Sequence, residues 1–298
     1  MPSPTDPTPD RPGTDPHGHR PDTAGGGHLP ADGRVRAPGP FDEHIGERDL
    51  ASWRSTPGRV LARGATRLGA RSPHAVTLLV TAILGGLLCL LLTQVSAEVY
   101  ESVKEGDALA SIDRPTLDLM LRWRSPDLDQ WITWFTDLGG PVLAPAIAAV
   151  VMAFLAWRWR SWTPVVLMVI AGAGSLAMTI AGKDLVGRLR PPLADAVPPY
   201  EYSPSFPSGH TLNAVVIAGT LAYLLLAHEH TRVSRTLAVL AAVVYAVAMG
   251  LSRVFLGHHW LSDVVMGWAL GLAWLTALIT AHRLWLTVKR DKATNVGA

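Results

Sequence analysis

The chain of 298 residues has a single cysteine, Cys89, so it forms no disulfide within itself and no cysteine-based metal site. It also lacks a strong charge of either sign, because 26 Lys and Arg face 24 Asp and Glu. The resulting formal net charge of +2 gives no reason to expect a nucleic-acid partner. Long stretches contain no charge at all, and this uneven distribution is more informative than the average composition.

The N-terminal part of the chain is poor in large apolar side chains. Residues 1–40 contain ten prolines and seven glycines. Such a segment cannot bury enough apolar surface to offset the conformational entropy that is lost on ordering. We therefore predict a disordered tail over residues 1–48.

A basic segment, residues 49–74, follows this tail. Its arginines recur every four residues, at Arg59, Arg63, Arg67 and Arg71. On a helix this spacing places them in one stripe. Next to a membrane, such a stripe either attracts anionic headgroups of the cytoplasmic leaflet or stays solvated and only sets the topology, and we favour the second interpretation.

Six stretches of 17 to 23 residues are free of charged side chains. They cover residues 75–97, 138–157, 161–182, 211–227, 236–252 and 264–281. A helix of about 20 residues spans about 30 Å, the thickness of the hydrocarbon core of a bilayer. One such stretch is compatible with a buried helix of a soluble protein. Six in one chain predict an all-α, polytopic membrane protein, with a bundle of six transmembrane helices over residues 75–285.

The charges between these stretches predict how the bundle lies in the membrane. Basic groups precede the first stretch, join the second to the third and the fourth to the fifth, and follow the sixth. The loop expected over residues 98–137 instead carries nine acidic and four basic side chains. Because cytoplasmic loops are enriched in Lys and Arg, we expect a multi-pass plasma-membrane protein with both termini, including a tail over residues 286–298, in the cytoplasm.

Four cations depart from this rule, because they lie on the outer side at the ends of the stretches: Lys183, Arg188, Arg190 and Arg253. The first cluster is KDLVGRLRPP, residues 183–192, where Lys183 and Arg190 fall near one face if the helix continues as far as Pro191. An ammonium and a guanidinium so placed can clamp a phosphate group. Cations at a helix C-terminus also suit the helix dipole without any site.

The second cluster is SPSFPSGHT, residues 203–211, which opens the fourth stretch. Ser208 can cap the helix, and Gly209 allows an anion to approach the free backbone N–H groups of the helix start. His210 is unexpected there, because a cation is disfavoured beside the positive end of a helix. We therefore infer a functional role for His210.

The third cluster is SRVFLGHHWLSD, residues 252–263. On a helix, His259 and Asp263 share a face as residues i and i+4. The carboxylate can then fix the imidazole tautomer and free the other ring nitrogen to act as a nucleophile or base. Arg253 can reach the same anion across the intervening turn. The side chain of His258 points about 100° away on a helix, and we interpret it as a neighbour without a role.

Taken together, KDLVGRLRP, PSGH and SRVFLGHHWLSD resemble the three signature motifs of the type 2 phosphatidic acid phosphatase family, which shares its site with vanadium haloperoxidases. The family patterns are Lys-x6-Arg-Pro, Pro-Ser-Gly-His and Ser-Arg-x5-His-x3-Asp. All three are complete here and stand in the usual order. The resemblance covers the predicted membrane portion, residues 75–285.

The resemblance implies a phosphatase that needs neither metal nor cofactor and works through a phosphohistidine. His259 would attack phosphorus, Asp263 would orient it, and His210 would protonate the leaving oxygen and then activate water. The phosphate would be bound by Lys183, Arg190, Ser208, Gly209 and Arg253. The expected substrate is a membrane lipid phosphate, such as undecaprenyl diphosphate, phosphatidic acid or phosphatidylglycerophosphate, bound at the outer face.

Other classes of protein share parts of this pattern. A transporter or a lipid-binding protein uses charges in its helices, although here they gather at one interface instead of at mid-membrane. A haloperoxidase would share the anion site, but those relatives are soluble. Two histidines and an aspartate can also bind a metal, which three neighbouring cations would repel. Glu201 and Tyr202, before the second cluster, are interpreted as ordinary loop residues, with a headgroup contact as the alternative.

Overall fold

The computed structural model describes residues 111–228 and 231–296 without interruption. It also describes residues 44–45, 48–49, 53 and 55–69 and seven isolated helical positions between 79 and 98. Nearly all of the predicted tail lies outside the described residues, and so does the first predicted span apart from those isolated positions.

Three short elements precede the main body of the described chain. Strand β1 (His44–Ile45) pairs antiparallel with β2 (Arg48–Asp49), at the end of the segment predicted as a tail. Helix α1 (Thr56–Gly69) lies in the basic segment. Three arginines of the predicted stripe, Arg59, Arg63 and Arg67, lie on this helix, while Arg71 lies outside the described residues. Arg63 Nε donates to the Arg59 carbonyl one turn before it over 3.3 Å.

Helices make up most of the chain from residue 111 onward. They are α4 (Asp113–Arg122), α5 (Pro126–Asp137), α6 (Leu143–Trp159), α7 (Thr163–Val186), the 3-10 turn η1 (Leu193–Asp195), α8 (Gly209–His228), α9 (Arg232–Phe255) and α10 (Leu261–Val296). Four segments are long and apolar enough to cross a membrane: Thr163–Val186, Gly209–His228, Arg232–Phe255 and Leu261–Lys289. The apolar α6 is shorter, with 17 residues. A helical membrane protein is thus confirmed, while a total of six spans stays a prediction.

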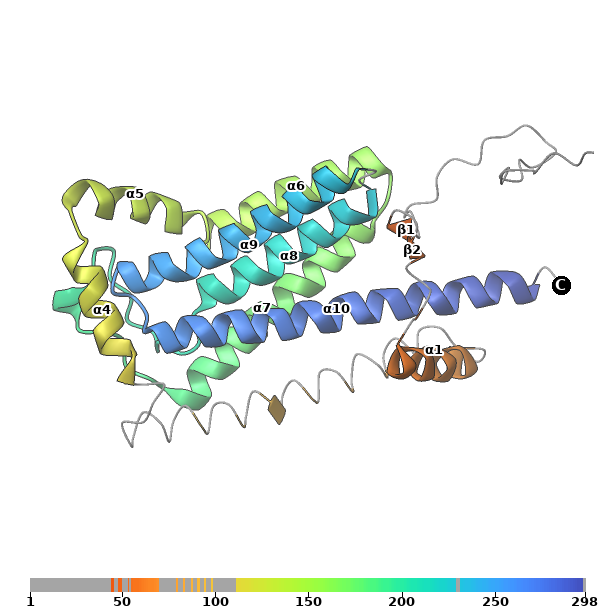
Figure 1. Cartoon of the computed structure of the whole chain (residues 1–298), viewed down its shortest axis with the longest axis horizontal. Coiled ribbons are helices and arrows are strands. Elements are labelled where there is room, and N and C mark those ends of the chain that lie inside the picture. Colours follow the sequence, from red (N-terminus) through yellow and green to blue (C-terminus); the bar gives the residue numbers. More distant parts are fainter. Residues whose placement is uncertain are drawn as a thin grey trace, which may run out of the picture. The chain divides into compact units, whose positions relative to one another are not determined.

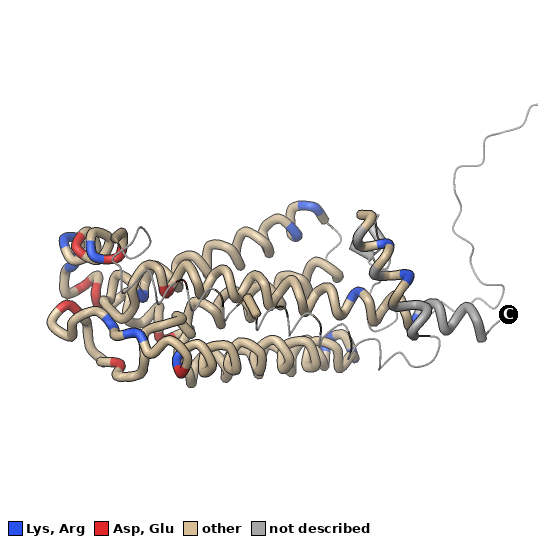
Figure 2. The backbone as a smooth tube through the Cα atoms, turned by 90° about the horizontal axis from the view of Figure 1, so that it is seen from below, with Lys and Arg blue, Asp and Glu red and all other residues tan. Residues whose placement is uncertain are grey.

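The connection predicted over residues 98–137 between the first two spans contains two short helices, α4 and α5. Ser125 caps α5 by accepting a hydrogen bond from Leu128 N over 3.3 Å, and Pro126 begins the helix. Both helices lie at one end of the bundle formed by α6 to α10, and α4 crosses that end (Figure 1). Acidic and basic residues gather at this end, whereas the middle of the bundle is almost free of charge (Figure 2).

Helix α8 packs against α7, α9 and α10 and forms the centre of the bundle. Val216 on α8 is completely buried in the core. Small residues on α10 allow close packing, since a Cβ on Gly271 would come within 2.8 Å of the Val215 Cβ. The two helices stay close as far as their first turns, where Ser208 N donates to the Asp263 carbonyl over 3.2 Å. This contact joins the second and third sequence clusters.

Candidate active site

The first cluster begins on α7 and continues beyond it. The helix ends at Val186, and Gly187 follows with a φ of 60°, in the left-handed region that terminates many helices. The prediction that the helix continues towards Arg190 is therefore wrong. Ser203 nevertheless connects the two cations of this cluster, because Lys183 Nζ donates to its hydroxyl over 2.6 Å and Arg190 Nη2 donates to it over 3.2 Å.

The third cluster lies in the turn between α9 and α10. Residues 256–260 are not helical and α10 begins at Leu261, so the premise that His259 and Asp263 share a helix face is wrong. The pair is formed all the same, with His259 Nδ1 at 3.5 Å from Asp263 Oδ2. Asp263 lies in the first turn of α10 and also accepts a hydrogen bond from Trp260 N over 3.0 Å. The carboxylate folds back over the helix start, and this brings it to the histidine.

Gly257 shapes the turn that presents His259. Its φ is 70°, and a Cβ there would overlap the carbonyl oxygen of Asp195 in η1. The turn is closed by the Arg253 carbonyl, which accepts hydrogen bonds from His258 N over 3.0 Å and from His259 N over 3.2 Å. Backbone bonds therefore hold both histidines directly beside the arginine at the end of α9.

The surroundings of His259 define which of its nitrogens carries the proton. Its Nε2 lies 3.2 Å from Arg190 Nη1. A guanidinium has only donors, so Nε2 is the unprotonated acceptor and the proton lies on Nδ1, facing Asp263. Ser205 Oγ lies 3.4 Å from the same Nδ1 and donates to Asp263. Burial lowers the pKa of His259 to about 4, although Asp263 opposes the shift, so the imidazole is neutral at neutral pH.

Buried charged residues behind Asp263 hold its carboxylate in place. Arg188 donates to Asp263 Oδ1 over 2.7 Å from one nitrogen and to Asp113 Oδ2 over 2.7 Å from the other. Ser262 donates to the Asp113 carboxylate from its amide over 2.8 Å and from its hydroxyl over 2.7 Å. In the sequence, Arg188 stands out as a cation on the unexpected side of the membrane without a predicted partner, and Asp113 on α4 carries no signal.

Glu201 lies in the centre of the cationic side of the site, so its interpretation as an ordinary loop residue is wrong. Its Oε2 is 2.7 Å from Arg190 Nη2, and its Oε1 forms an ion pair with Arg253 Nη2. Burial alone would raise the pKa of Glu201, but Arg253 and Arg190 outweigh it and lower the pKa to about 2. Its neighbour Tyr202 is 82% exposed. The negative charge of Glu201 and the positive charges of Arg190 and Arg253 thus lie together near His259.

Arg253 is almost completely buried, with a relative exposure of 2%. Its Nη1 donates to Thr136 Oγ1, near the end of α5, over 3.2 Å. Its Nε is buried and has no hydrogen-bond partner within the described part of the chain. Helix α5 therefore helps to orient the guanidinium.

The second cluster opens α8. The Ser208 carbonyl accepts from Leu212 N over 3.0 Å, as an N-cap residue does. Ser208 is completely buried, and its hydroxyl accepts from Thr211 Oγ1 over 2.8 Å. A Cβ on Gly209 would lie 3.0 Å from the Thr179 methyl group, which favours glycine at the first position of the helix. The predicted phosphate-binding residues thus begin the helix, with the Ser208 amide already bonded within the protein.

Two further histidines border the site. His210, in the first turn of α8, lies within electrostatic range of Arg253, Glu201 and His259. His258 turns its side chain to the other side, where Nε2 lies 2.7 Å from the Val197 carbonyl. Among the residues that the structure describes, no group of three or more His, Cys, Asp and Glu side chains is arranged to hold a metal ion.

Apolar helices that carry these three clusters at their ends define an integral-membrane phosphatase. A model of the PAP2 superfamily matches residues 161–286. Phosphatidylglycerophosphatase B of Bacillus subtilis is 30% identical over 167 residues, which cover 56% of this chain and 81% of the relative. The chain belongs to the PAP2 superfamily.

Two further comparisons agree with this membership. Undecaprenyl-diphosphatase of Sulfolobus acidocaldarius is 31% identical over 137 residues, which cover 44% of this chain and 59% of the relative. The crystal structure of a transmembrane PAP2-type phosphatidylglycerolphosphate phosphatase from Bacillus subtilis superimposes with a TM-score of 0.56 at 26% identity. The superposition covers 64% of this chain and 92% of the other, so nearly the whole of that fold has a counterpart here.

Proposed function

We propose that this membrane phosphatase removes a phosphate group from a lipid monophosphate or diphosphate through a phosphohistidine on His259. The observation that carries the proposal is the geometry of that imidazole. Nδ1 faces Asp263 at 3.5 Å, and the unprotonated Nε2 lies beside Arg190 at 3.2 Å. A neutral imidazole with its lone pair directed at a cationic pocket is suited to attack a phosphorus atom.

The attack forms a bond from His259 Nε2 to phosphorus and breaks the bond from phosphorus to the lipid oxygen. Positive charge develops on the imidazole, and Asp263 stabilises it from the Nδ1 side. His210 protonates the departing oxygen. It then accepts a proton from the water that attacks the phosphohistidine, so that inorganic phosphate leaves and both histidines regain their starting states.

The cations of the site have the role of stabilising the equatorial oxygens during both steps. The candidates are Lys183, Arg190 and Arg253, together with the Ser208 hydroxyl and the Gly209 amide. Their links support a common pocket, because Ser203 joins Lys183 to Arg190 and Glu201 joins Arg190 to Arg253. The charge is supplied by fixed side chains, so we expect no requirement for a divalent metal.

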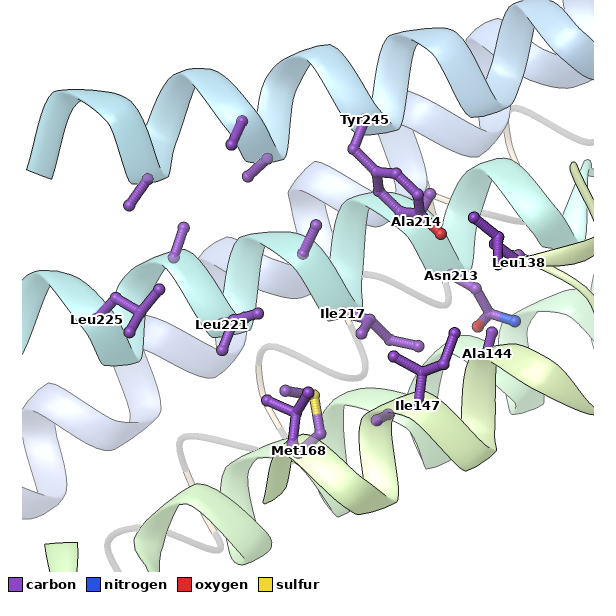
Figure 3. A pocket seen from close by; sticks show the side chains of 18 residues that line it. Leu138, Ala144, Ile147, Met168, Asn213, Ala214, Ile217, Leu221, Leu225 and Tyr245 are labelled. Atoms are coloured by element: carbon purple, nitrogen blue, oxygen red, sulfur yellow. The ribbon is translucent and has the colours of Figure 1, made fainter. Parts of the chain in front are cut away.

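An apolar cavity supports a substrate with a hydrocarbon tail. It has a volume of about 290 Å³ and lies between α6, α7, α8 and α9 (Figure 3). Asn213 and Ala214 line it, three and four residues after His210 on the same helix face. Lining residues continue along α8 as far as Leu225, a rise of about 22 Å from His210 at 1.5 Å per residue. The tail would therefore lie along α8 while the phosphate lies at the helix start.

The candidate substrates are undecaprenyl diphosphate, phosphatidic acid and phosphatidylglycerophosphate. Two of these correspond to the activities named for the relatives from Sulfolobus acidocaldarius and Bacillus subtilis. We place the site at the outer face of the plasma membrane, with both termini in the cytoplasm. The support is the excess of Arg and Lys in the opposite loops.

The deciding experiment measures inorganic phosphate released by the purified full-length protein in detergent from each of the three lipids. We expect release from at least one lipid in excess chelator, and inhibition by vanadate, which mimics five-coordinate phosphorus. Activity that disappears with chelator and returns with metal would contradict the metal-free mechanism. Absence of release from every lipid would contradict the proposed function itself.

A matched pair of variants tests the tail site. Ala241 lines the cavity, whereas Val243 on the same helix is 54% exposed and does not line it. We expect Ala241→Phe to lower kcat/KM for a long-chain lipid phosphate about tenfold by filling the cavity. Turnover of a short-chain analogue should change little, and Val243→Phe should leave both substrates unaffected. Equal losses on long and short chains would place the tail elsewhere.

A further inference from the structure

Glu201 lies in the cationic pocket of the site. Its carboxylate bridges two guanidinium groups, through a 2.7 Å contact to Arg190 and an ion pair with Arg253. Both arginines are assigned above to the phosphate. The Glu201 side chain is 31% exposed and comes from the loop before α8, whereas the arginines are 9% and 2% exposed. An accessible loop carboxylate is therefore bound to buried cations.

The carboxylate binds a guanidinium group that a phosphate on His259 would also meet. Arg190 Nη1 lies 3.2 Å from His259 Nε2, the atom that would bond to phosphorus. The oxygens of a phosphate on Nε2 would therefore meet the Arg190 guanidinium, whose Nη2 is already bound to Glu201. Glu201 and the phosphate would then share one guanidinium, and like charges at such separations repel strongly.

The other buried carboxylates near the site do not compete in this way. Asp263 and Asp113 are bound to Arg188, and to the hydroxyl groups of Ser205 and Ser262 respectively. In the described part of the chain, the contacts of Arg190 and Arg253 to carboxylates are those to Glu201. Glu201 is thus the carboxylate that would compete with an incoming phosphate for these two arginines.

We propose that Glu201 is an internal anion that sets the affinity of the site for phosphate: it holds Arg190 and Arg253 in the empty enzyme, is displaced by the substrate, and returns as inorganic phosphate leaves. The inference rests on the proposed function, because it takes these arginines as the phosphate ligands. Competition by Glu201 would help the enzyme to release its product, because two buried guanidinium groups without a competing anion would retain phosphate.

Internal competition has a quantitative signature. When only a fraction of the molecules has the pocket open, the apparent affinity of every ligand falls by that same fraction. A carboxylate that fills the pocket about nine-tenths of the time weakens phosphate, vanadate and lipid phosphate alike, by about tenfold. A carboxylate that only positioned the arginines would instead strengthen binding.

The test compares the wild-type protein with Glu201→Gln, which removes the charge and keeps the shape. Dissociation constants of orthovanadate and inorganic phosphate are measured by calorimetry in detergent, and KM is measured with phosphatidic acid. We expect all three constants to fall by a common factor of about ten. Glu201→Asp retains the charge with a shorter reach, so it should give an intermediate factor.

Asp127→Asn is the control for charge, because Asp127 is an exposed acidic residue in the first turn of α5 and should leave all three constants unchanged. Unchanged or larger constants in Glu201→Gln, or factors that differ between ligands, would overturn the inference. The calorimetric arms need no turnover. Tighter vanadate binding in Glu201→Gln, combined with no phosphate release by the wild type, would therefore refute the proposed function and leave the competition intact.

Discussion

Asp263 and Glu201 are two carboxylates close to one histidine, and the protein holds them in opposite ways. Asp263 is completely buried, and its oxygens accept hydrogen bonds from Arg188, Ser205 and Trp260 N. Glu201 is partly exposed on a loop and contacts two arginines that the proposed substrate also needs. The site thus has a fixed half, Asp263 with its buried partners, and a replaceable half, in which Glu201 contacts Arg190 and Arg253.

The difference follows from what removal of each carboxylate leaves behind. Without Asp263, Arg188 would be left buried between one carboxylate and an empty position, which costs several kcal/mol. Without Glu201, a phosphate can bind the same guanidinium groups, because their N–H groups can donate to either a carboxylate or a phosphate. A buried carboxylate with several protein partners, such as Asp263, is thus suited to orient a catalytic group. A partly exposed one, such as Glu201, is suited to occupy a binding pocket until a ligand replaces it.

The largest expected effect concerns His259, which lies between the two halves. His259→Ala removes the atom that we propose bonds to phosphorus, so phosphate release should become undetectable, a loss of roughly four decades or more. The assay is release of inorganic phosphate from the preferred lipid under saturating conditions. Near-normal release by His259→Ala would show that neither carboxylate acts through this imidazole.

Asp263→Asn should have the next largest effect. The amide no longer stabilises the imidazolium and can favour the wrong tautomer, so kcat should fall by roughly two to four decades. Thermal unfolding of the variant in detergent separates this loss from misfolding. If Asp263→Asn and Glu201→Gln lowered kcat to the same extent, the distinction between a fixed and a replaceable carboxylate would be lost.

Arg188→Met tests the buried cluster behind Asp263 and should act mainly on stability. It leaves Asp113 and Asp263 buried without their shared cation, at a cost of about 3–5 kcal/mol in the free energy of unfolding. The double variant Arg188→Met/Asp113→Asn should recover part of this loss, because one of the stranded charges is gone. Denaturant or thermal unfolding in detergent measures both, and a stability equal to that of the wild type would refute the cluster.

The smallest effect is expected for His258. Its side chain is directed to the Val197 carbonyl, whereas His259 is the histidine of the proposed phosphate pocket. We expect His258→Ala to change kcat/KM by less than about threefold, close to the range of ordinary contacts outside the chemistry. An inactive His258→Ala together with an active His259→Ala would reverse the assignment of the two histidines.

The spans were the easiest part of the fold to predict. Charge-free runs at 161–182, 211–227, 236–252 and 264–281 correspond to α7, α8, α9 and α10. Helices α7, α9 and α10 continue past their runs by about a turn or more, because the bilayer excludes charge only from its apolar core, while backbone hydrogen bonding continues past it. The short helices α4 and α5 escaped prediction, since amphipathic segments of 10 and 12 residues have no such constraint.

The candidate site was predictable where its residues lie close together in the sequence. The motifs identified His259 and Asp263 as a pair, although the helical register used to justify it was wrong. Glu201 and Asp113 were beyond reach, because Arg253 lies 52 residues from Glu201 and Arg188 lies 75 residues from Asp113. Arg190 is nearer to Glu201 in the sequence, but an irregular segment joins the two. No spacing rule relates such positions.

The amino-acid sequence was therefore sufficient for the membrane class, for the order of the apolar helices and for the family motifs that supply the proposed phosphate site. These properties depend on local composition and on spacing within one segment. The partner of each charge was decided by packing, since Arg188 reaches Asp113 only after α4 lies across the end of the bundle. Glu201 likewise meets Arg190 and Arg253 only when the loop before α8 folds over them, because ion pairs depend on distances in space that no short motif encodes.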